Sequence, residues 1–228
     1  VYAPTTLELS ESGLRVEGEL PKDLLGTYFR NGPNPIHQPE NRYHPFDGDG
    51  MVHAVSFCEG EAAYRNRYVE TAALAKERKL GRSTSNGVMG PFDFDASPFG
   101  IKDTSNTDLF YYAGGLMTLW YNAGHPYRLN PQTLETEGHF ELAGRSHRRL
   151  SAHSKVDWAT GELLFFDYGD EPDFEVSCTL GGLISQESDV WQPPLNGSNV
   201  KGTIGGGPAV GQGRILTASG GGPAEGAV

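Results

Sequence analysis

The stretch Leu150-Ser-Ala-His-Ser-Lys-Val-Asp-Trp-Ala-Thr-Gly-Glu-Leu-Leu-Phe-Phe-Asp-Tyr168 predicts a β-hairpin around which the rest of the chain is organised. Its first strand carries His153, a tight turn spans Asp157 to Gly161, and a second strand returns to Tyr168. A histidine held rigidly by a sheet is suited to bind a metal ion. A single histidine in a strand also commonly makes only structural hydrogen bonds, so these residues alone leave both interpretations open.

Strands are predicted in pairs along the preceding sequence as well. Alternating apolar residues and glycine-containing turns predict hairpins over 51–69, turning at 59–61, and over 108–121, turning at Gly114-Gly115. The segments Asn130–Glu135 and Asp157–Glu162 share a turn pattern, and each lies between predicted strands. Antiparallel strands that follow one another in this way are typical of the blades of a β-propeller.

Two further elements are predicted before the second hairpin. Thr71 to Lys79 is the only good helical run, and it is short and charged on one side. The alternation in Leu14 to Leu20 predicts an edge strand. The chain is therefore predicted to be an all-β protein with one short helix.

Composition excludes several classes of partner. The 228 residues carry a formal net charge of -11, and the pI is about 5.0, which argues against binding to nucleic acid or to an anionic membrane surface. No stretch approaches the ~20 consecutive apolar residues of a transmembrane helix. Cys58 and Cys178 match no metal or redox spacing, so a reduced, cytoplasmic setting is expected.

Three sequence blocks, in the same order along the chain, resemble the carotenoid oxygenase family, which includes carotenoid and stilbene cleavage dioxygenases and the retinoid isomerase of the eye. The first resembles the family's N-terminal signature, the second its middle block and the third its first iron-ligand segment. The blocks are Gly26–Pro35 with Phe46–His53; Asp103–Thr107 with Pro126-Tyr127 and Thr133–Thr136; and Ala152–Asp157 with Thr160–Glu162.

The resemblance implies a seven-bladed β-propeller, of which residues 1–175 are the N-terminal blades. Residues 176–228 show no such resemblance. This tail is rich in glycine and proline, and it is expected to be a coil that is disordered or aberrant. Because the chain begins at Val1 and the family's later segments are missing, a fragment of a longer protein is expected.

In that family, four neutral histidines hold one Fe2+ ion, which activates O2 beside a conjugated alkene. The resemblance therefore implies Fe2+ as the cofactor, and O2 and a hydrophobic alkene as the substrates. It also implies His153 as the first iron ligand, whereas the other three ligands lie in family segments that this chain does not match. A site improvised from His147 and His153 is disfavoured, because two arginines between them predict an exposed bend.

Two functional hypotheses follow. In the first, the chain is part of a nonhaem iron dioxygenase that cleaves a double bond of a carotenoid or apocarotenoid. In the second, it is a noncatalytic β-sheet fragment without an assembled iron site. A stilbene-cleaving dioxygenase is a further alternative. Asn122 stands where many members carry a glutamate that orients a ligand histidine. Tyr121 stands where stilbene-cleaving members tend to carry a lysine, and the absence of that lysine favours carotenoid-like substrates.

Three remaining motifs favour structural roles. His53 lies in a family motif but not at a ligand position, so a role in the first blade is expected. Asp47 and Asp49 predict a turn, because the run lacks the further oxygen ligands of a calcium loop. Gly205 to Gly213 resembles a phosphate-binding loop but has no Lys-Ser/Thr ending, so a low-complexity linker is predicted.

Overall fold

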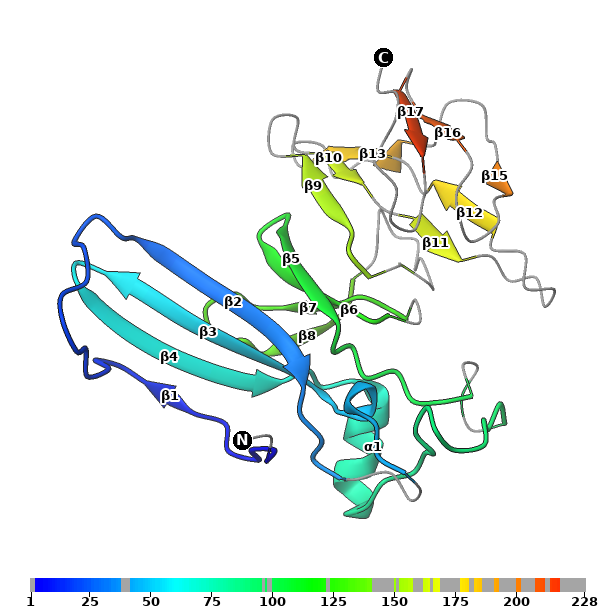
Figure 1. Ribbon diagram of the computed structural model, residues 1–228, viewed down its shortest axis with the longest axis horizontal. Helices are drawn as coiled ribbons and strands as arrows, with labels where there is room; N and C mark the ends of the chain where they lie inside the picture. Colours follow the sequence, from blue (N-terminus) through cyan, green and yellow to red (C-terminus); the bar gives the residue numbers. More distant parts are fainter. Residues whose placement is uncertain are drawn as a thin grey trace.

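The structure is a computed structural model of the 228-residue chain (Figure 1). It describes the following residues: 3–37, 42–95, 97, 100–121, 124–140, 150, 152–157, 162–164, 166–168, 177–180, 183–185, 191–192, 200–201, 208–211 and 214–217. Within these ranges, one α-helix and a series of antiparallel strands are found. The prediction of an all-β chain with one short helix is therefore confirmed.

The first sheet contains three long strands and one short edge strand, in the order β1-β4-β3-β2. The strands are β1 (Ser10–Glu11), β2 (Gly26–Pro33), β3 (Gly50–Cys58) and β4 (Glu61–Tyr68). Glu59 and Gly60, with φ of 50° and 85°, form the predicted turn between β3 and β4. The edge strand was predicted at Leu14–Leu20 and lies instead at β1, which pairs with Tyr64 and Arg65 of β4.

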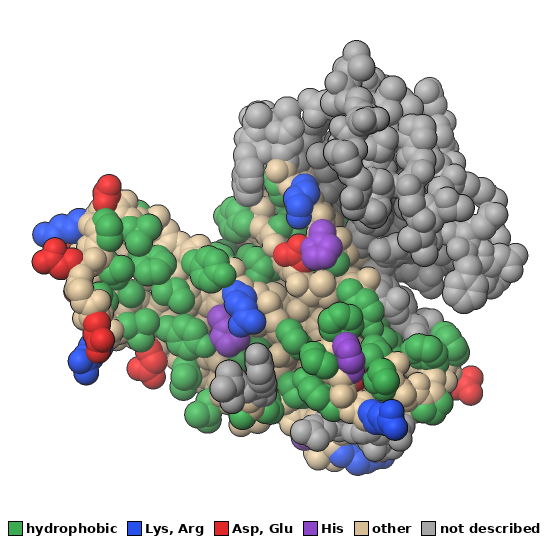
Figure 2. All heavy atoms as spheres, in the orientation of Figure 1, with side chains coloured by type: hydrophobic (Ala, Val, Ile, Leu, Met, Phe, Trp, Pro, Cys, Tyr) green, Lys and Arg blue, Asp and Glu red, His purple; other side chains and the backbone are tan. Residues whose placement is uncertain are grey.

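The first sheet extends away from the rest of the molecule, and one of its faces carries exposed apolar side chains (Figures 1 and 2). Tyr28, Leu24 and Leu25 are among the large hydrophobic residues that remain exposed. Where the first sheet meets the second, Val52 and Ala54 pack against Leu116 and neighbouring residues of the second sheet. Burial of these side chains stabilises the contact between the two sheets.

The second sheet has the order β5-β6-β7-β8. Its strands are β5 (Asp108–Tyr112), β6 (Gly115–Leu119), β7 (Tyr127–Leu129) and β8 (Thr136–His139). Every residue of β6 is buried, as expected for an inner strand with packing on both faces. The hairpin turn between β5 and β6 is Ala113-Gly114, with φ of 47° and 75°, one residue earlier than predicted, because Tyr112 pairs with Gly115.

Helix α1 (Ala72–Leu80) follows the first sheet and confirms the predicted helix. The side chain of Thr71 caps its start by accepting from the backbone N–H of Leu74 at 3.1 Å, and Gly81, with φ of 68°, ends it. In the part of the chain that the structure describes, no helix has the length and apolar character needed to span a membrane.

Further strands follow Leu150, whose side chain packs with those of Ala152 and Leu163 against the second sheet. The predicted hairpin forms from β9 (Lys155–Asp157) and β10 (Glu162–Leu164), which belong to a four-stranded sheet of order β14-β13-β10-β9. The remaining strands are β11 (Phe166–Tyr168), β12 (Ser177–Leu180), β13 (Leu183–Ser185), β14 (Trp191–Gln192), β15 (Val200–Lys201), β16 (Pro208–Gly211) and β17 (Arg214–Thr217).

The strands beyond residue 175 differ from the predicted coil. Residues of β12 and β13 pair with β11 and β10, and β16 pairs with β17, so these parts of the tail form strands. For the rest of residues 176–228 the coil prediction lies outside the described residues. Part of the glycine-rich Gly205–Gly213 segment accordingly lies in strand β16. Successive four-stranded antiparallel sheets are the arrangement of propeller blades, so the predicted partial β-propeller is confirmed.

Candidate metal-binding site

His153, the predicted metal ligand, lies in a turn immediately before β9. The sequence predicted it on a strand, and that prediction was wrong. Its φ of 70° is in the left-handed region, which costs a residue with a Cβ roughly 1–2 kcal/mol. Ala152 and Ser154 on either side are 7% and 4% exposed, whereas the His153 side chain is 68% exposed. A buried backbone thus holds an outward-facing imidazole.

A carboxylate from another element contacts this imidazole. The Nδ1 atom of His153 lies 2.8 Å from the Oδ2 atom of Asp108, the first residue of β5. A carboxylate oxygen can only accept, so Nδ1 is the donor in this bond. Nε2 is then left as the nitrogen that can bind a metal ion, the arrangement commonly found at metal-binding histidines. A neutral imidazole with its Nε2 lone pair available is chemically suited to be one ligand of an iron site.

Asn31, from the N-terminal motif, holds the segment that leads into β5. Its amide Nδ2 donates to the backbone carbonyls of Ser105 at 2.8 Å and Asp108 at 3.3 Å. Ser105 has a φ of 45°, and its hydroxyl makes a 2.8 Å bond with that of Thr118. A chain of hydrogen bonds therefore joins the N-terminal motif, the middle block and His153.

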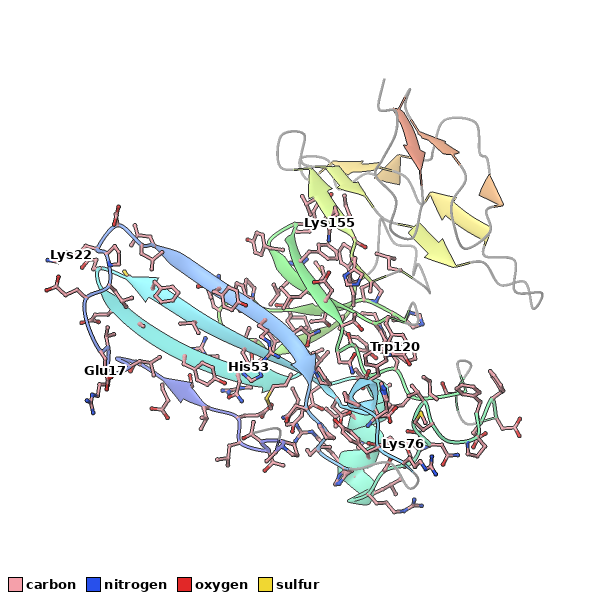
Figure 3. The ribbon with its side chains drawn as sticks, in the orientation of Figure 1. Glu17, Lys22, His53, Lys76, Trp120 and Lys155 are labelled. Carbon is pink, nitrogen blue, oxygen red and sulfur yellow. The ribbon has the colours of Figure 1, made fainter. Side chains whose placement is uncertain are left out.

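The other described histidines lie elsewhere. His53 belongs to the first sheet (Figure 3), where its Nδ1 atom lies 2.7 Å from the hydroxyl of Tyr64. Burial, and then the nearby Arg30, lower the pKa of His53. These contacts bear out its predicted structural role. His44 accepts from the backbone N–H of Phe46 at 3.2 Å, at the start of a short 3-10 helix, Pro45–Asp47.

The described residues do not complete a metal site around His153. Among the residues that the structure describes, no group of three or more His, Cys, Asp or Glu residues could hold a metal ion. The rings of His125 and His139 contact each other with their centroids 4.8 Å apart and their planes tilted by 54°. His147, considered earlier as a partner, and Asn122 both lie outside the described residues. One imidazole alone does not make an iron site.

Asp47 and Asp49 stabilise the fold through hydrogen bonds and an ion pair. Asp47 accepts from the backbone N–H groups of His44 and Val88, both at 2.8 Å. Asp49 and Glu77 each lie 2.8 Å from the Nζ atom of Lys102. Burial alone would lower the pKa of Lys102, but these two carboxylates hold it above its ordinary value. The predicted turn is confirmed, because the 3-10 helix Pro45–Asp47 and a bend at Gly48 lead the chain into β3 at Gly50.

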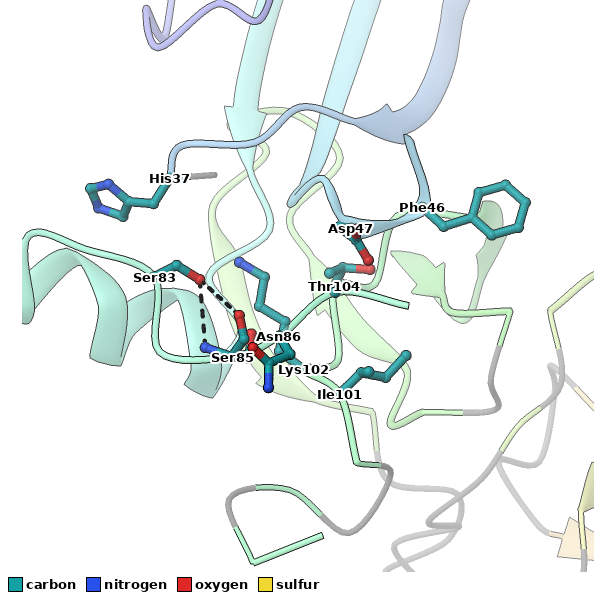
Figure 4. A pocket seen from close by; sticks show the side chains of 10 residues that line it. His37, Phe46, Asp47, Ser83, Ser85, Asn86, Ile101, Lys102 and Thr104 are labelled. Atoms are coloured by element: carbon teal, nitrogen blue, oxygen red, sulfur yellow. Dashed lines mark hydrogen bonds between the residues drawn. The ribbon is translucent and has the colours of Figure 1, made fainter. Parts of the chain in front are cut away.

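The pocket beside Asp47 is too small for an alkene substrate. It is lined by residues that include Asp47, Lys102 and Thr104 (Figure 4), and its volume is about 10 Å³. That volume is about one water molecule.

Tyr121 lies close to Phe46, with ring centroids 5.2 Å apart. Burial and the nearby Asp47 raise the pKa of the Tyr121 hydroxyl to about 12.

Sequence reasoning missed a larger hollow that contains a buried acid. Its volume is about 410 Å³, and it lies between α1 and the second sheet; Lys76, Asp103 and His139 are among its lining residues. Burial raises the pKa of Asp103 to about 7, although the backbone N–H groups of Ser105 and His125 donate to it and oppose the shift. Asp103 stood in the middle block, but nothing in its spacing indicated burial.

Comparisons with known proteins find a family model and several curated proteins that match this chain. The family model described as retinal pigment epithelial membrane protein matches residues 2–193, which extends beyond the three motifs. Isoeugenol monooxygenase of Pseudomonas nitroreducens is 38% identical over 166 residues, covering 72% of this chain and 34% of that protein. Apocarotenoid-15,15'-oxygenase of Synechocystis is 36% identical over 200 residues, covering 77% of this chain and 40% of that protein.

A solved structure agrees with these matches. The lignostilbene dioxygenase of Pseudomonas brassicacearum superposes with a TM-score of 0.65 and 32% identity, over 73% of this chain and 35% of that one. The chain thus spans between a third and two fifths of the length of the relatives it matches.

Proposed function

Because the chain belongs to the carotenoid oxygenase family, we propose that it forms the N-terminal part of a nonhaem Fe2+ dioxygenase that cleaves a conjugated carbon–carbon double bond. The family match over residues 2–193 is the observation that carries this proposal. When bound, iron would supply the binding and activation of O2 beside the alkene. His153 would contribute one neutral imidazole to it, through Nε2.

We propose a carotenoid or apocarotenoid as the substrate. The support is the 36% identity to an apocarotenoid oxygenase, together with the lack of a lysine at Tyr121. A phenolic alkene such as a stilbene is the second candidate. Its support is the 38% identity to isoeugenol monooxygenase and the 36% identity to the resveratrol cleavage oxygenase of Aspergillus fumigatus.

The noncatalytic alternative concerns this chain by itself. Among the described residues, no group of three or more His, Cys, Asp or Glu residues could hold a metal ion, so we propose that the 228 residues alone do not assemble the four-histidine site. The test is the iron content of the purified chain, measured with cleavage assays on an apocarotenal and on resveratrol. Substoichiometric iron and no turnover are expected. Stoichiometric iron with cleavage of either alkene would overturn the proposal.

We also propose a cytoplasmic location. Cys58 is a free, exposed thiol, as a reducing compartment allows. Cell fractionation of the tagged protein tests this, and recovery with secreted or membrane fractions would contradict it.

A further inference from the structure

Asp108 is fixed in place by contacts other than the one with His153. Its Oδ1 atom accepts from the backbone N–H of Leu109 at 2.8 Å, and its backbone carbonyl accepts from the Asn31 amide at 3.3 Å. The residue opens β5, where it pairs with Leu119 of β6. The second oxygen, Oδ2, therefore has a position determined by the sheet.

The His153 ring depends on that oxygen for its orientation. The side chain is 68% exposed, so packing restrains it little, and its Nδ1–Oδ2 bond of 2.8 Å is the polar contact that the structure gives it. A free exposed ring would sample several rotamers and both neutral tautomers. Accepting from Nδ1–H selects the tautomer whose lone pair lies on Nε2.

We propose that Asp108 is a positioning residue, which holds the His153 imidazole in the Nδ1–H tautomer and thereby presents Nε2 to a metal ion. The metal-binding role of His153 rests on the proposed function, whereas the hydrogen bond and the tautomer do not. Partners of this kind commonly change metal affinity by about 10- to 100-fold when they are removed. No sequence motif points to Asp108, because 45 residues separate it from His153.

The test uses the 228-residue chain labelled with 15N. Side-chain nitrogen shifts of histidine are recorded at a pH well above the ordinary histidine pKa of about 6.5, where the ring is neutral. The His153 ring is expected to be protonated at Nδ1 in the wild-type chain and mainly at Nε2 in D108A. In D108N a single amide oxygen replaces two carboxylate oxygens, and the backbone N–H of Leu109 holds that oxygen. The NH2 group then faces Nδ1 of His153, so the ring is expected to shift toward the Nε2–H tautomer in this variant as well.

Two controls separate this role from a general disturbance of the fold. The rings of His53 and His139 should keep their signals in every variant. D95N, which changes an exposed carboxylate elsewhere, should leave the His153 signals unchanged. An Nε2–H tautomer in the wild-type chain, or the same tautomer in wild type and D108A, would overturn the proposal. D108N keeps the test available if D108A does not fold.

A metal titration gives a second readout. Co2+ is added while the broadening of each histidine ring signal is followed. The Co2+ concentration that half-broadens the His153 signal is expected to be at least about tenfold higher in D108A than in the wild-type chain. The Co2+ response of the His139 signal should be the same in both proteins. An equal response of His153 in both proteins would contradict a positioning role. If the tautomer result holds but family-type iron binding does not, the proposed function fails while the Asp108 contact stands.

Discussion

His153 occupies a backbone conformation that glycine adopts without strain and that residues with a Cβ adopt only at a cost. Its φ is 70°, and its neighbours Ala152 and Ser154 are buried, so the turn cannot easily relax. Strain of this kind at one exposed histidine is consistent with a functional requirement for the side chain.

We predict that H153G is more stable to unfolding than H153A by about 1 kcal/mol, because both lose the imidazole but only glycine relieves the strain. Urea denaturation followed by circular dichroism measures the difference. The same pair of substitutions at His139, which does not have a positive φ, should show the opposite order. Equal stability of H153G and H153A would show that the turn is unstrained.

Asp103 gives the stability a dependence on pH. Its pKa is about 7 in the folded chain and 3.8 ordinarily, so the folded state favours the protonated carboxyl. The resulting contribution to stability is fully present below pH 3.8 and is lost as the pH rises through about 7. We predict that the unfolding free energy of the wild-type chain falls relative to that of D103N across this range. A difference that does not change with pH would contradict the prediction.

Sequence reasoning found His153 but not the residues that define its surroundings. The motif around it is local, so it could be read directly from the chain. Asp108 and Asn31 act on it across long separations, and no spacing rule connects such residues before the fold is known. Lys102 was missed for the same reason, since its partners Asp49 and Glu77 come from different elements.

At the scale of elements, the two hairpin turns use the same backbone geometry with different residues. In the β5–β6 turn, Ala113 has a φ of 47° where asparagine or glycine is preferred, and Gly114 follows with a φ of 75°. We predict that A113N stabilises the chain by about 0.5–1 kcal/mol, as an Asn-Gly type I′ turn. E59N in the first hairpin, at a φ of 50°, should have the same sign. A lower urea midpoint for A113N would contradict this assignment.

The buried ion pairs of Lys102 connect α1 to the loop that precedes β3. The side chains of Asp49 and Glu77 are 2% and 0% exposed, so removing the ammonium group would leave two buried carboxylates without their partner. We predict that K102M lowers the unfolding free energy by about 3–5 kcal/mol. K76M, on the exposed side of α1, should change it by less than about 0.5 kcal/mol. Unfolding of K102M at the wild-type urea concentration would contradict this role.

Strands and helix were predictable where their signals are local. Alternating side chains and glycine-containing turns identified β3, β4, β5 and β6, and a helical run identified α1. The edge strand was misplaced, because pairing at β1 depends on which segment reaches β4 and not on alternation alone. His153 was placed on a strand because the sequence does not reveal a positive φ.

At the scale of the whole molecule, the chain forms part of a propeller and contributes one candidate metal ligand, His153. The chain spans about 34% of isoeugenol monooxygenase and 40% of the apocarotenoid oxygenase, and the described residues present one imidazole, that of His153, of the proposed metal site. In the proposed site, residues supplied by the remainder of such a protein would have to bind the same metal ion as Nε2 of His153. The sequence predicted this through the family resemblance, whereas composition and charge only excluded other partners.

The iron content of a chimera tests this claim most directly. The chimera joins this chain to the part of the Synechocystis apocarotenoid oxygenase that lies beyond the matched region, and it is compared with its H153A variant. We predict about one iron per chimera, together with cleavage of an apocarotenal, and loss of both in H153A. Full iron occupancy in the H153A chimera would show that His153 is not a ligand and would contradict the account.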